Sequence, residues 1–153
     1  MRMRAGILAG LVAVAVSVAA GELNGVTMKD SVTVGGKSLT LNGIGLRKKS
    51  IIKVYVAGLY LEKKSSDANA ILKADGARHL EMEFVRDVGK DKISEAWTEG
   101  LTNNTPGASA DVKAKMTKMC GWMEDMEEKG RIVFSYTPGK GTEVSVKGKV
   151  KGT

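Results

Sequence analysis

The run from Ile51 to Leu61, IIKVYVAGLYL, constrains the fold more than any other part of the sequence. Lys53 is its only charged residue, and valine, isoleucine and tyrosine favour strands. Successive side chains of a strand point to opposite faces of a sheet, and this run is apolar at both sets of alternating positions. We therefore predict a long strand that needs cover on both faces.

A cluster of cations stands immediately before this strand. The residues Asn42-Gly43-Ile44-Gly45 predict a turn, and Arg47, Lys48 and Lys49 follow it. An arginine keeps its charge, and its planar guanidinium suits carboxylates and other anionic oxygens. Its place beside an apolar strand indicates an apolar pocket with one cationic group. The alternative is an ordinary surface charge.

The N-terminus has the pattern of a secretory signal peptide. Arg2 and Arg4 precede an apolar run of small and aliphatic residues that ends near Ala20. This run is shorter than the roughly twenty residues that span a membrane, so an uncleaved anchor is the less favoured alternative. We predict a signal peptide at residues 1–20, one domain at residues 21–153, and export to the periplasm or the medium.

Composition excludes several classes of function. Loss of Arg2 and Arg4 lowers the formal net charge from +7 to +5, and the scattered cations lack interleaved aromatic residues, which argues against nucleic-acid binding. Cys120 is the only cysteine, so neither an intramolecular disulfide nor a cysteine metal cage can form. It lies in an apolar helical pattern, which indicates a buried structural thiol. With one histidine and no paired carboxylates in an apolar run, hydrolase and metal-enzyme functions are weakly supported.

The remaining pattern predicts an α+β domain with helices on one face of a mainly antiparallel sheet. A methionine stripe predicts that the last helix continues to Lys129, and His79, Glu81 and Glu83 share a strand face that we expect to be solvated. The other expected strands are 26–28, 31–34, 38–41, 78–86, 131–137 and 142–147, and the expected helices are 68–73, 90–103 and 110–129.

The segment GIGLRKKSIIKVYVAGLYLE, together with FVRDV, two helical segments and a final hairpin, resembles the chalcone isomerase-like family, and most of all its exported bacterial branch. The resemblance covers residues 38–147. It implies an open-faced sandwich, in which a large antiparallel sheet carries a helix layer over a ligand cleft. Relatives continue past the final hairpin into another helical segment, so we expect that a C-terminal segment is missing after Thr153.

Family membership alone does not fix the function, because plant members cyclise chalcones, other branches bind fatty acids, and fungal mitochondrial relatives bind haem. The resemblance places Arg47 at the catalytic arginine of the plant enzymes and Tyr55 at their strand threonine. Their catalytic tyrosine and asparagine fall at Gly89 and Ala96, so both polar groups are lost. The loss of two such groups costs several kcal/mol of transition-state stabilisation, and we expect no efficient chalcone cyclisation.

We predict an exported protein that binds a small hydrophobic anion such as a fatty acid. Arg47 is the expected anion anchor, Tyr55 and Tyr60 are the expected ligand-binding residues, and no cofactor, nucleic acid or stable membrane span is expected. Two alternatives stay open. One is haem binding, with His79 as the axial ligand and Arg47 at a propionate. The other is an isomerase or intramolecular lyase acting on an enone, in which Arg47 polarises a carbonyl and Tyr55 or Tyr60 transfers a proton.

Overall fold

A computed structural model describes residues 21–153, and the predicted signal peptide lies outside the described residues. The strands are β1 (Gly21–Leu23), β2 (Val26–Met28), β3 (Ser31–Val34), β4 (Lys37–Lys49), β5 (Ile52–Leu61), β6 (Arg78–Phe84), β7 (Arg131–Thr137), β8 (Gly141–Val146) and β9 (Lys149–Gly152). The helices are α1 (Ala68–Lys73), α2 (Lys90–Asn104) and α3 (Ala110–Cys120).

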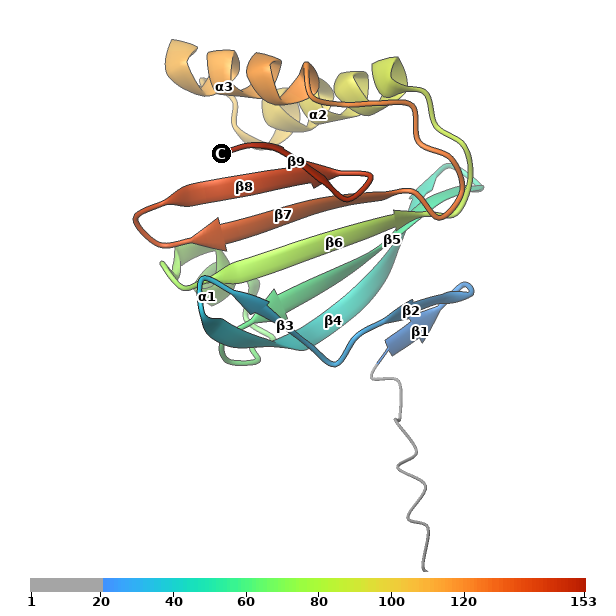
Figure 1. Cartoon of the computed structure of the whole chain (residues 1–153). Coiled ribbons are helices and arrows are strands. Elements are labelled where there is room, and N and C mark those ends of the chain that lie inside the picture. The colour runs from blue at the N-terminus through green and yellow to red at the C-terminus, as the bar shows by residue number, and fades with distance from the viewer. Residues whose placement is uncertain (1–20) are drawn as a thin grey trace, which may run out of the picture.

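Strands β3 to β9 form one antiparallel sheet in which each strand pairs with its neighbours along the chain, while β1 and β2 form a separate hairpin. In chain order, helix α1 connects β5 to β6, and α2 and α3 follow β6 and precede β7. Figure 1 shows α2 and α3 together at one end of the sheet, beyond β8 and β9. The sheet is curled, and the turn after β3 comes back to β7, so a Cβ added at Gly35 would lie 3.0 Å from the Thr137 side chain. This architecture confirms the predicted α+β fold with a large antiparallel sheet.

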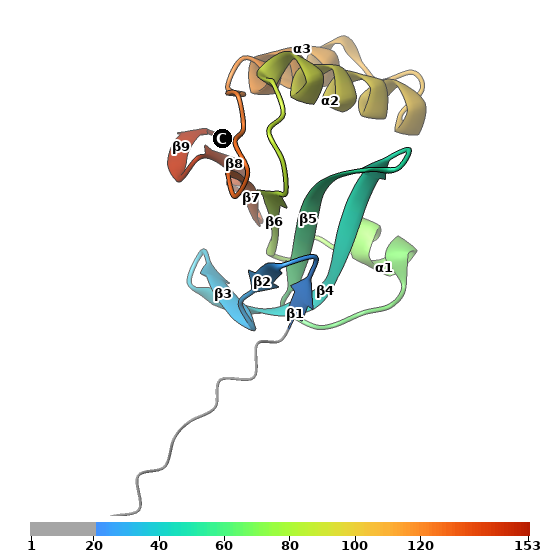
Figure 2. The same ribbon diagram turned by 90° about the vertical axis from the view of Figure 1, so that its right-hand side faces the viewer.

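The sheet has a hydrophobic core on each face. The hairpin-side core, under β1 and β2, consists of Val26, Met28, Val34, Leu39, Leu41, Val56, Tyr60 and Ala77. The helix-side core consists of Phe84, Ile93, Met123, Met126, Ile132, Val144 and Val146. Figure 2 shows α1 on one side of the β4–β5 ribbon and β1 to β3 on the other. Strand β5 contributes Val56 and Tyr60 to one core while Val54 and Tyr55 pack against the other, so it is covered on both faces as predicted.

The predicted turn at residues 42–45 is wrong, because β4 runs through it without a break. Gly43, Ile44 and Gly45 pair with β5, and only Asn42 bulges out of the ladder. The Asn42 amide is held by Ser65, whose backbone N–H donates to Oδ1 at 2.8 Å and whose carbonyl accepts from Nδ2 at 3.1 Å. Pairing with the long apolar partner strand therefore overrides the local turn preference of the glycines.

The predicted helix 110–129 is also too long. Its start is as expected, since Ser109 accepts the backbone N–H of Val112 as N-cap, but the helix ends at Cys120 with Gly121 as C-cap. Met126 instead exchanges two backbone hydrogen bonds with Val88, at 2.8 and 2.9 Å. A glycine costs about 1 kcal/mol inside a helix, and the bridge to Val88 satisfies the backbone groups of the loop.

Candidate functional site

Arg47 and Tyr55 lie directly opposite each other in the β4–β5 ladder. Cross-strand partners of this kind present their side chains on the same face of the sheet. The Tyr55 ring packs against the helix-side core, where its centroid lies 5.6 Å from that of Phe84. The structure thus brings together the arginine and the tyrosine that the sequence placed in one candidate site.

Arg47 has no carboxylate partner among residues 21–153, since none of the ion pairs in this part of the chain involves it. Its side chain is exposed, and Nη1 donates to the backbone carbonyl of Lys48 at 2.9 Å. The guanidinium has five N–H donors, so most of its hydrogen-bonding capacity is free. It can therefore accept an anionic group without breaking an internal ion pair.

The hydroxyl of Tyr55 is suited to donate a hydrogen bond. Burial raises its pKa above the usual tyrosine value, and the positive charge of Arg47 offsets part of that rise. The phenol is therefore neutral at physiological pH and keeps its proton. Together, Arg47 and Tyr55 can supply one charged and one neutral donor to the same carboxylate.

Two glycines leave the same face of β4 bare. Gly43 pairs with Leu59, and Gly45 pairs with Ala57, so both alternate with Arg47 along the face that carries Tyr55. A Cβ added at either glycine would find no heavy atom within 4 Å. Glycine in a strand interior commonly marks a place where another group approaches the backbone. Here the bare backbone lies next to the free guanidinium.

An apolar strip continues from these glycines across the sheet. Leu59 pairs with Leu80, which in turn pairs with Phe134, and all three side chains are half-buried. Trp97 of α2 meets Phe134 edge-on, with ring centroids 5.5 Å apart. On the side of α1, Arg78 lies over the Tyr136 ring at 5.4 Å and donates to the Ile71 carbonyl. The strip therefore lies between α2 and the Arg78–Tyr136 pair.

Tyr60 is not part of this site. It lies on the opposite face, fully buried in the hairpin-side core, and its ring meets His79 at a centroid distance of 5.4 Å. Side chains alternate between the two faces along β5, so Tyr60, at an even position, points away from the face that carries Tyr55, at an odd position. The two tyrosines therefore cannot line one face of the sheet together.

The face with His79, Glu81 and Glu83 is buried, so the expected solvated face is wrong. Arg131 of β7 joins both carboxylates, at 2.6 Å to Glu81 and 2.5 Å to Glu83. The neighbouring His79 ring and the charge of Arg131 hold the pKa of Glu81 below its usual value, although burial opposes this shift. The alternating pattern of residues 78–86 correctly predicted a strand. It could not predict that β3 and the β1–β2 hairpin cover the face with His79, Glu81 and Glu83, because that cover depends on tertiary packing.

The residues proposed for haem do not fit a haem site in this arrangement. His79 Nδ1 lies 2.9 Å from the Ser135 hydroxyl, and Nε2 lies 3.9 Å from the Glu81 carboxylate, so both ring nitrogens face protein groups. His79 and Arg47 also lie on opposite faces of the sheet, as their ladder positions require. One haem cannot take its axial ligand and its propionate partner from the two sides at once.

Gly89 and Ala96, the positions where the resemblance implies a catalytic tyrosine and asparagine, have no polar side chain. Gly89 is the N-cap of α2, and the Asp125 carboxylate accepts the Lys90 backbone N–H in place of a capping side chain, at 2.8 Å. Ala96 lies exposed on α2. Neither position can orient a substrate or a water molecule by hydrogen bonding.

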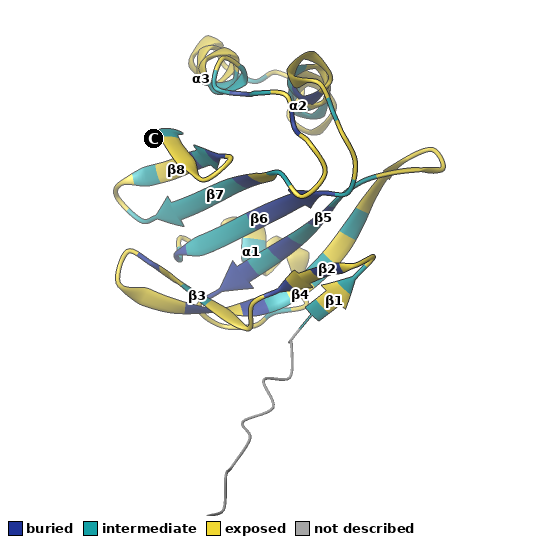
Figure 3. Ribbon diagram, turned by 45° about the vertical axis from the view of Figure 1, so that its right-hand side comes forward, coloured by how far each residue is buried: buried dark blue, intermediate teal, exposed yellow. Residues whose placement is uncertain are grey.

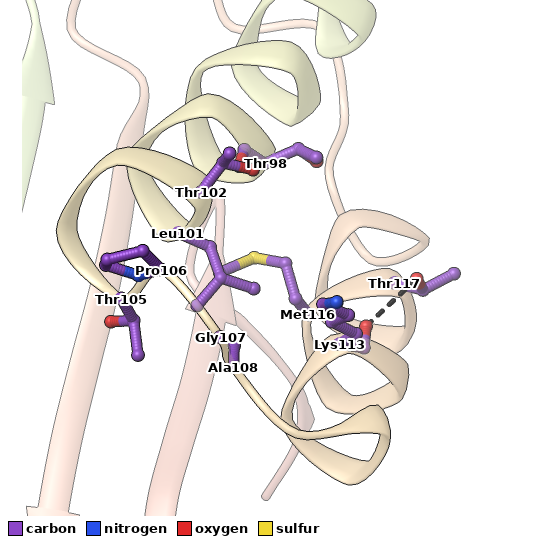
Figure 4. Close-up of a pocket in the computed structure, with 10 residues that line it drawn as sticks. All are labelled: Thr98, Leu101, Thr102, Thr105, Pro106, Gly107, Ala108, Lys113, Met116 and Thr117. Carbon is purple, nitrogen blue, oxygen red and sulfur yellow. Dashed lines mark hydrogen bonds between the residues drawn. The ribbon is translucent and has the colours of Figure 1, made fainter.

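A separate cavity of about 320 Å³ lies between α2 and α3 (Figure 4). Leu101 and Met116 form its apolar part, and threonines from both helices surround them. Arg47 and Tyr55 do not line it. Cys120, the last residue of α3, is half-buried, and its thiol points to the Ser94 carbonyl of α2 at 3.8 Å.

The described residues show neither a membrane span nor a metal site. No helix within residues 21–153 is long and apolar enough to cross a bilayer. In the same range, no three histidine, cysteine, aspartate or glutamate side chains gather closely enough to hold a metal ion.

Two comparisons identify relatives. A chalcone isomerase-like family model matches residues 20–153. The fold is similar to the crystal structure of a fatty-acid binding protein of Arabidopsis thaliana, with a TM-score of 0.66, 20% sequence identity, and coverage of 82% of this chain and 76% of that chain. A search of curated protein sequences gives no match.

Sequence reasoning missed the two strand glycines and the apolar strip as parts of the site. The signal for the glycines was present, since Gly43, Gly45 and Arg47 have the two-residue spacing of one strand face. It was hidden by the turn prediction. Phe134 gave no comparable signal, because its place beside Trp97 depends on how α2 packs on the sheet.

Proposed function

Because the chain belongs to the chalcone isomerase-like family, we propose that it is a fatty-acid-binding protein that holds the carboxylate with Arg47 and Tyr55. The observation that carries this proposal is the placement of a cation without a carboxylate partner next to two glycines that leave open space over β4. The plant fatty-acid binding protein of the same fold supports the choice of ligand class.

The carboxylate of the ligand would accept hydrogen bonds from the Arg47 guanidinium and the Tyr55 hydroxyl. Charge-assisted hydrogen bonds of this kind are about twice as strong as neutral ones. The acyl chain would lie over the bare backbone of Gly43 and Gly45 and then on the apolar strip of Leu59, Leu80 and Phe134. Burial of methylene groups against this strip contributes about 25 cal/mol for each Å² of apolar surface removed from water.

Binding is a better account of this site than catalysis. Arg47 can stabilise a negative charge, but Gly89 and Ala96 offer no polar side chain at the two positions where the resemblance expects groups that position a reacting substrate. The residues around Arg47 give no specific support to the isomerase alternative. An enone without a carboxylate would also leave most of the N–H donors of Arg47 without an acceptor.

The proposed location is outside the cytoplasm, in the periplasm or the medium, as expected for the exported bacterial branch. The support is the sequence of residues 1–20, with a basic start and an apolar run of signal-peptide length. Cell fractionation followed by N-terminal analysis of the recovered protein tests this. A processed N-terminus in the exported fraction supports the proposal, and an intact Met1 in the cytoplasm contradicts it.

The binding proposal is tested by titrating delipidated protein with a long-chain fatty acid in a calorimeter. Hydrogen bonds to charged groups contribute about 1.5–3 kcal/mol, so Arg47→Ala is expected to weaken binding by roughly 30-fold. Lys140→Ala is the matched control, because Lys140 is an exposed cation in the β7–β8 turn, at the opposite end of the sheet. Equal affinity of both variants and the wild type would contradict the role of Arg47.

A further inference from the structure

The tip of the β4–β5 hairpin presents apolar side chains to solvent. Ile51 is 90% exposed and Ile52 is 45% exposed. Figure 3 shows the tip extending beyond the body of the sheet, with exposed residues along both of its strands. Ser50 adopts a positive φ of 56°, in the left-handed region, and with Ile51 forms the two-residue turn that places an isoleucine at the apex.

Four cations surround these isoleucines. Arg47, Lys48 and Lys49 precede the turn, Lys53 follows it, and all four are exposed. The sequence has no acidic residue between positions 42 and 61. Glu95 on α2 interacts with Lys49 electrostatically but is already paired with Lys92 at 2.8 Å. The hairpin tip, defined here as residues 47–53, is therefore strongly positive.

An apolar apex with flanking cations matches the chemistry of a membrane interface. Apolar side chains enter the boundary between headgroups and acyl chains, while lysine and arginine stay at the level of the phosphates. The exposed Leu72 on α1 shows the contrast, because Asp67 and Asp75 lie within five residues of it and would oppose an anionic surface. Exposure of an apolar residue alone therefore does not distinguish the tip, but its combination with four cations does.

We propose that the hairpin tip docks on the surface of a bilayer that contains anionic phospholipids. Ile51 and Ile52 insert at the interface, and Lys48 and Lys49 contact phosphate groups, while the Lys53 ammonium, which donates to Asn24 Oδ1 at 2.6 Å, adds positive charge behind them. Each cation near an anionic surface strengthens binding about fivefold, so the tip gives reversible attachment rather than a permanent anchor. The attachment weakens with salt, because the Debye length falls from about 10 Å at 0.1 M to about 3 Å at 1 M.

Docking in this orientation brings the ligand site to the membrane. Arg47 is four residues from Ile51, which is at most about 13 Å even for a fully extended chain. With the apex at the acyl boundary, the Arg47–Tyr55 pair lies near the headgroups, where the carboxylates of membrane-bound fatty acids are found. This consequence rests on the proposed fatty-acid site, whereas the docking itself does not.

Sedimentation with phospholipid vesicles tests the docking without any fatty acid. One set of vesicles is pure phosphatidylcholine, and the other also contains phosphatidylglycerol. We expect binding to the second set alone, with loss of binding at high salt. Wild-type protein that ignores both sets, or binds both equally, would overturn the proposal. In the first of these cases the apolar apex would be better explained as a contact for a protein partner.

Three variants separate the contributions. The double variant Ile51→Ser and Ile52→Ser is expected to bind anionic vesicles on the order of tenfold more weakly, because apolar burial at the interface is lost. The double variant Lys48→Gln and Lys49→Gln is expected to lose about 25-fold. Leu72→Ser is the control, because Leu72 is also an exposed apolar side chain, at 75% exposure, and no change is expected. Undiminished binding by the isoleucine variant would overturn insertion of the tip.

A fluorescent probe reads insertion directly. A label that shifts to the blue in apolar surroundings is attached at Ile51→Cys in a Cys120→Ser background, which leaves one thiol. A blue shift on anionic vesicles is expected for this label and not for the same label at Leu72→Cys. Equal shifts at both positions, or no shift at either, would contradict the proposed orientation.

Discussion

Arg131 and Arg47 lie on opposite faces of the sheet and differ in their hydrogen-bond partners. Arg131, on the hairpin-side face, is joined to the buried carboxylates of Glu81 and Glu83. Arg47, on the helix-side face, has a backbone carbonyl as its hydrogen-bond partner and bare glycine backbone beside it. A charge with partners inside the protein is structural. A charge without them, beside open space, is available to a ligand.

The largest expected effect comes from removing the structural arginine. Arg131→Ala leaves two buried carboxylates without their partner, and loss of charged hydrogen bonds to buried groups costs about 2–3 kcal/mol when one side is partly exposed to solvent. Arg47→Ala removes an exposed side chain that has no ion pair among residues 21–153, and we expect a change within about 0.5 kcal/mol. Urea unfolding of both variants measures the difference. Similar losses of stability would remove the distinction between the two arginines.

A smaller effect is expected from filling the open space beside Arg47. Gly45→Leu adds a side chain where a Cβ meets no atom within 4 Å, so the fold is expected to tolerate it. The same side chain would occupy the proposed path of the acyl chain, and we expect fatty-acid affinity to fall about tenfold, comparable to losing two buried methylene groups. Ser38→Val, an exposed substitution near the other end of β4, is the control. Unchanged affinity in Gly45→Leu would place the acyl chain elsewhere.

The smallest effect concerns pH. The pKa of Glu81 is lowered in the folded protein, so its stabilising contribution is present above the unfolded glutamate pKa of about 4.3 and is lost as the pH falls through the folded value. Glu81→Gln cannot titrate. The difference in Tm between wild type and this variant is therefore expected to shrink in acid. A difference that stays constant from neutral to acid pH would show that Glu81 is not held by His79 and Arg131 as the structure indicates.

Most of the fold could be predicted because local patterns and tertiary packing agree. The long strand β5, the short helix α1 and the β7–β8 hairpin all follow from residues close in sequence. The errors occurred where backbone pairing with another segment overrides the local preference. Pairing with strand β5 keeps Gly43 and Gly45 extended. Met126, which the methionine spacing predicted to be helical, instead forms backbone hydrogen bonds with Val88.

The candidate site was predictable only in part for the same reason. Arg47 and Tyr55 belong to one distinctive segment, and the hairpin that pairs them is local. Tyr60 belongs to the same segment but falls on the other face, because the register and the alternation along β5 decide which face a side chain takes. The Arg131 network joins strands that are about fifty residues apart, and no local pattern signals such a pairing.

The central claim is that Arg47 recognises a carboxylate. The most direct measurement compares the dissociation constants of a fatty acid and the alcohol of the same chain length, for the wild type and for Arg47→Ala. The wild type is expected to prefer the acid by roughly 30-fold, from charged hydrogen bonds of about 2 kcal/mol, and the variant is expected to lose most of this preference while its affinity for the alcohol changes little. The same preference for the acid in both proteins would contradict the account.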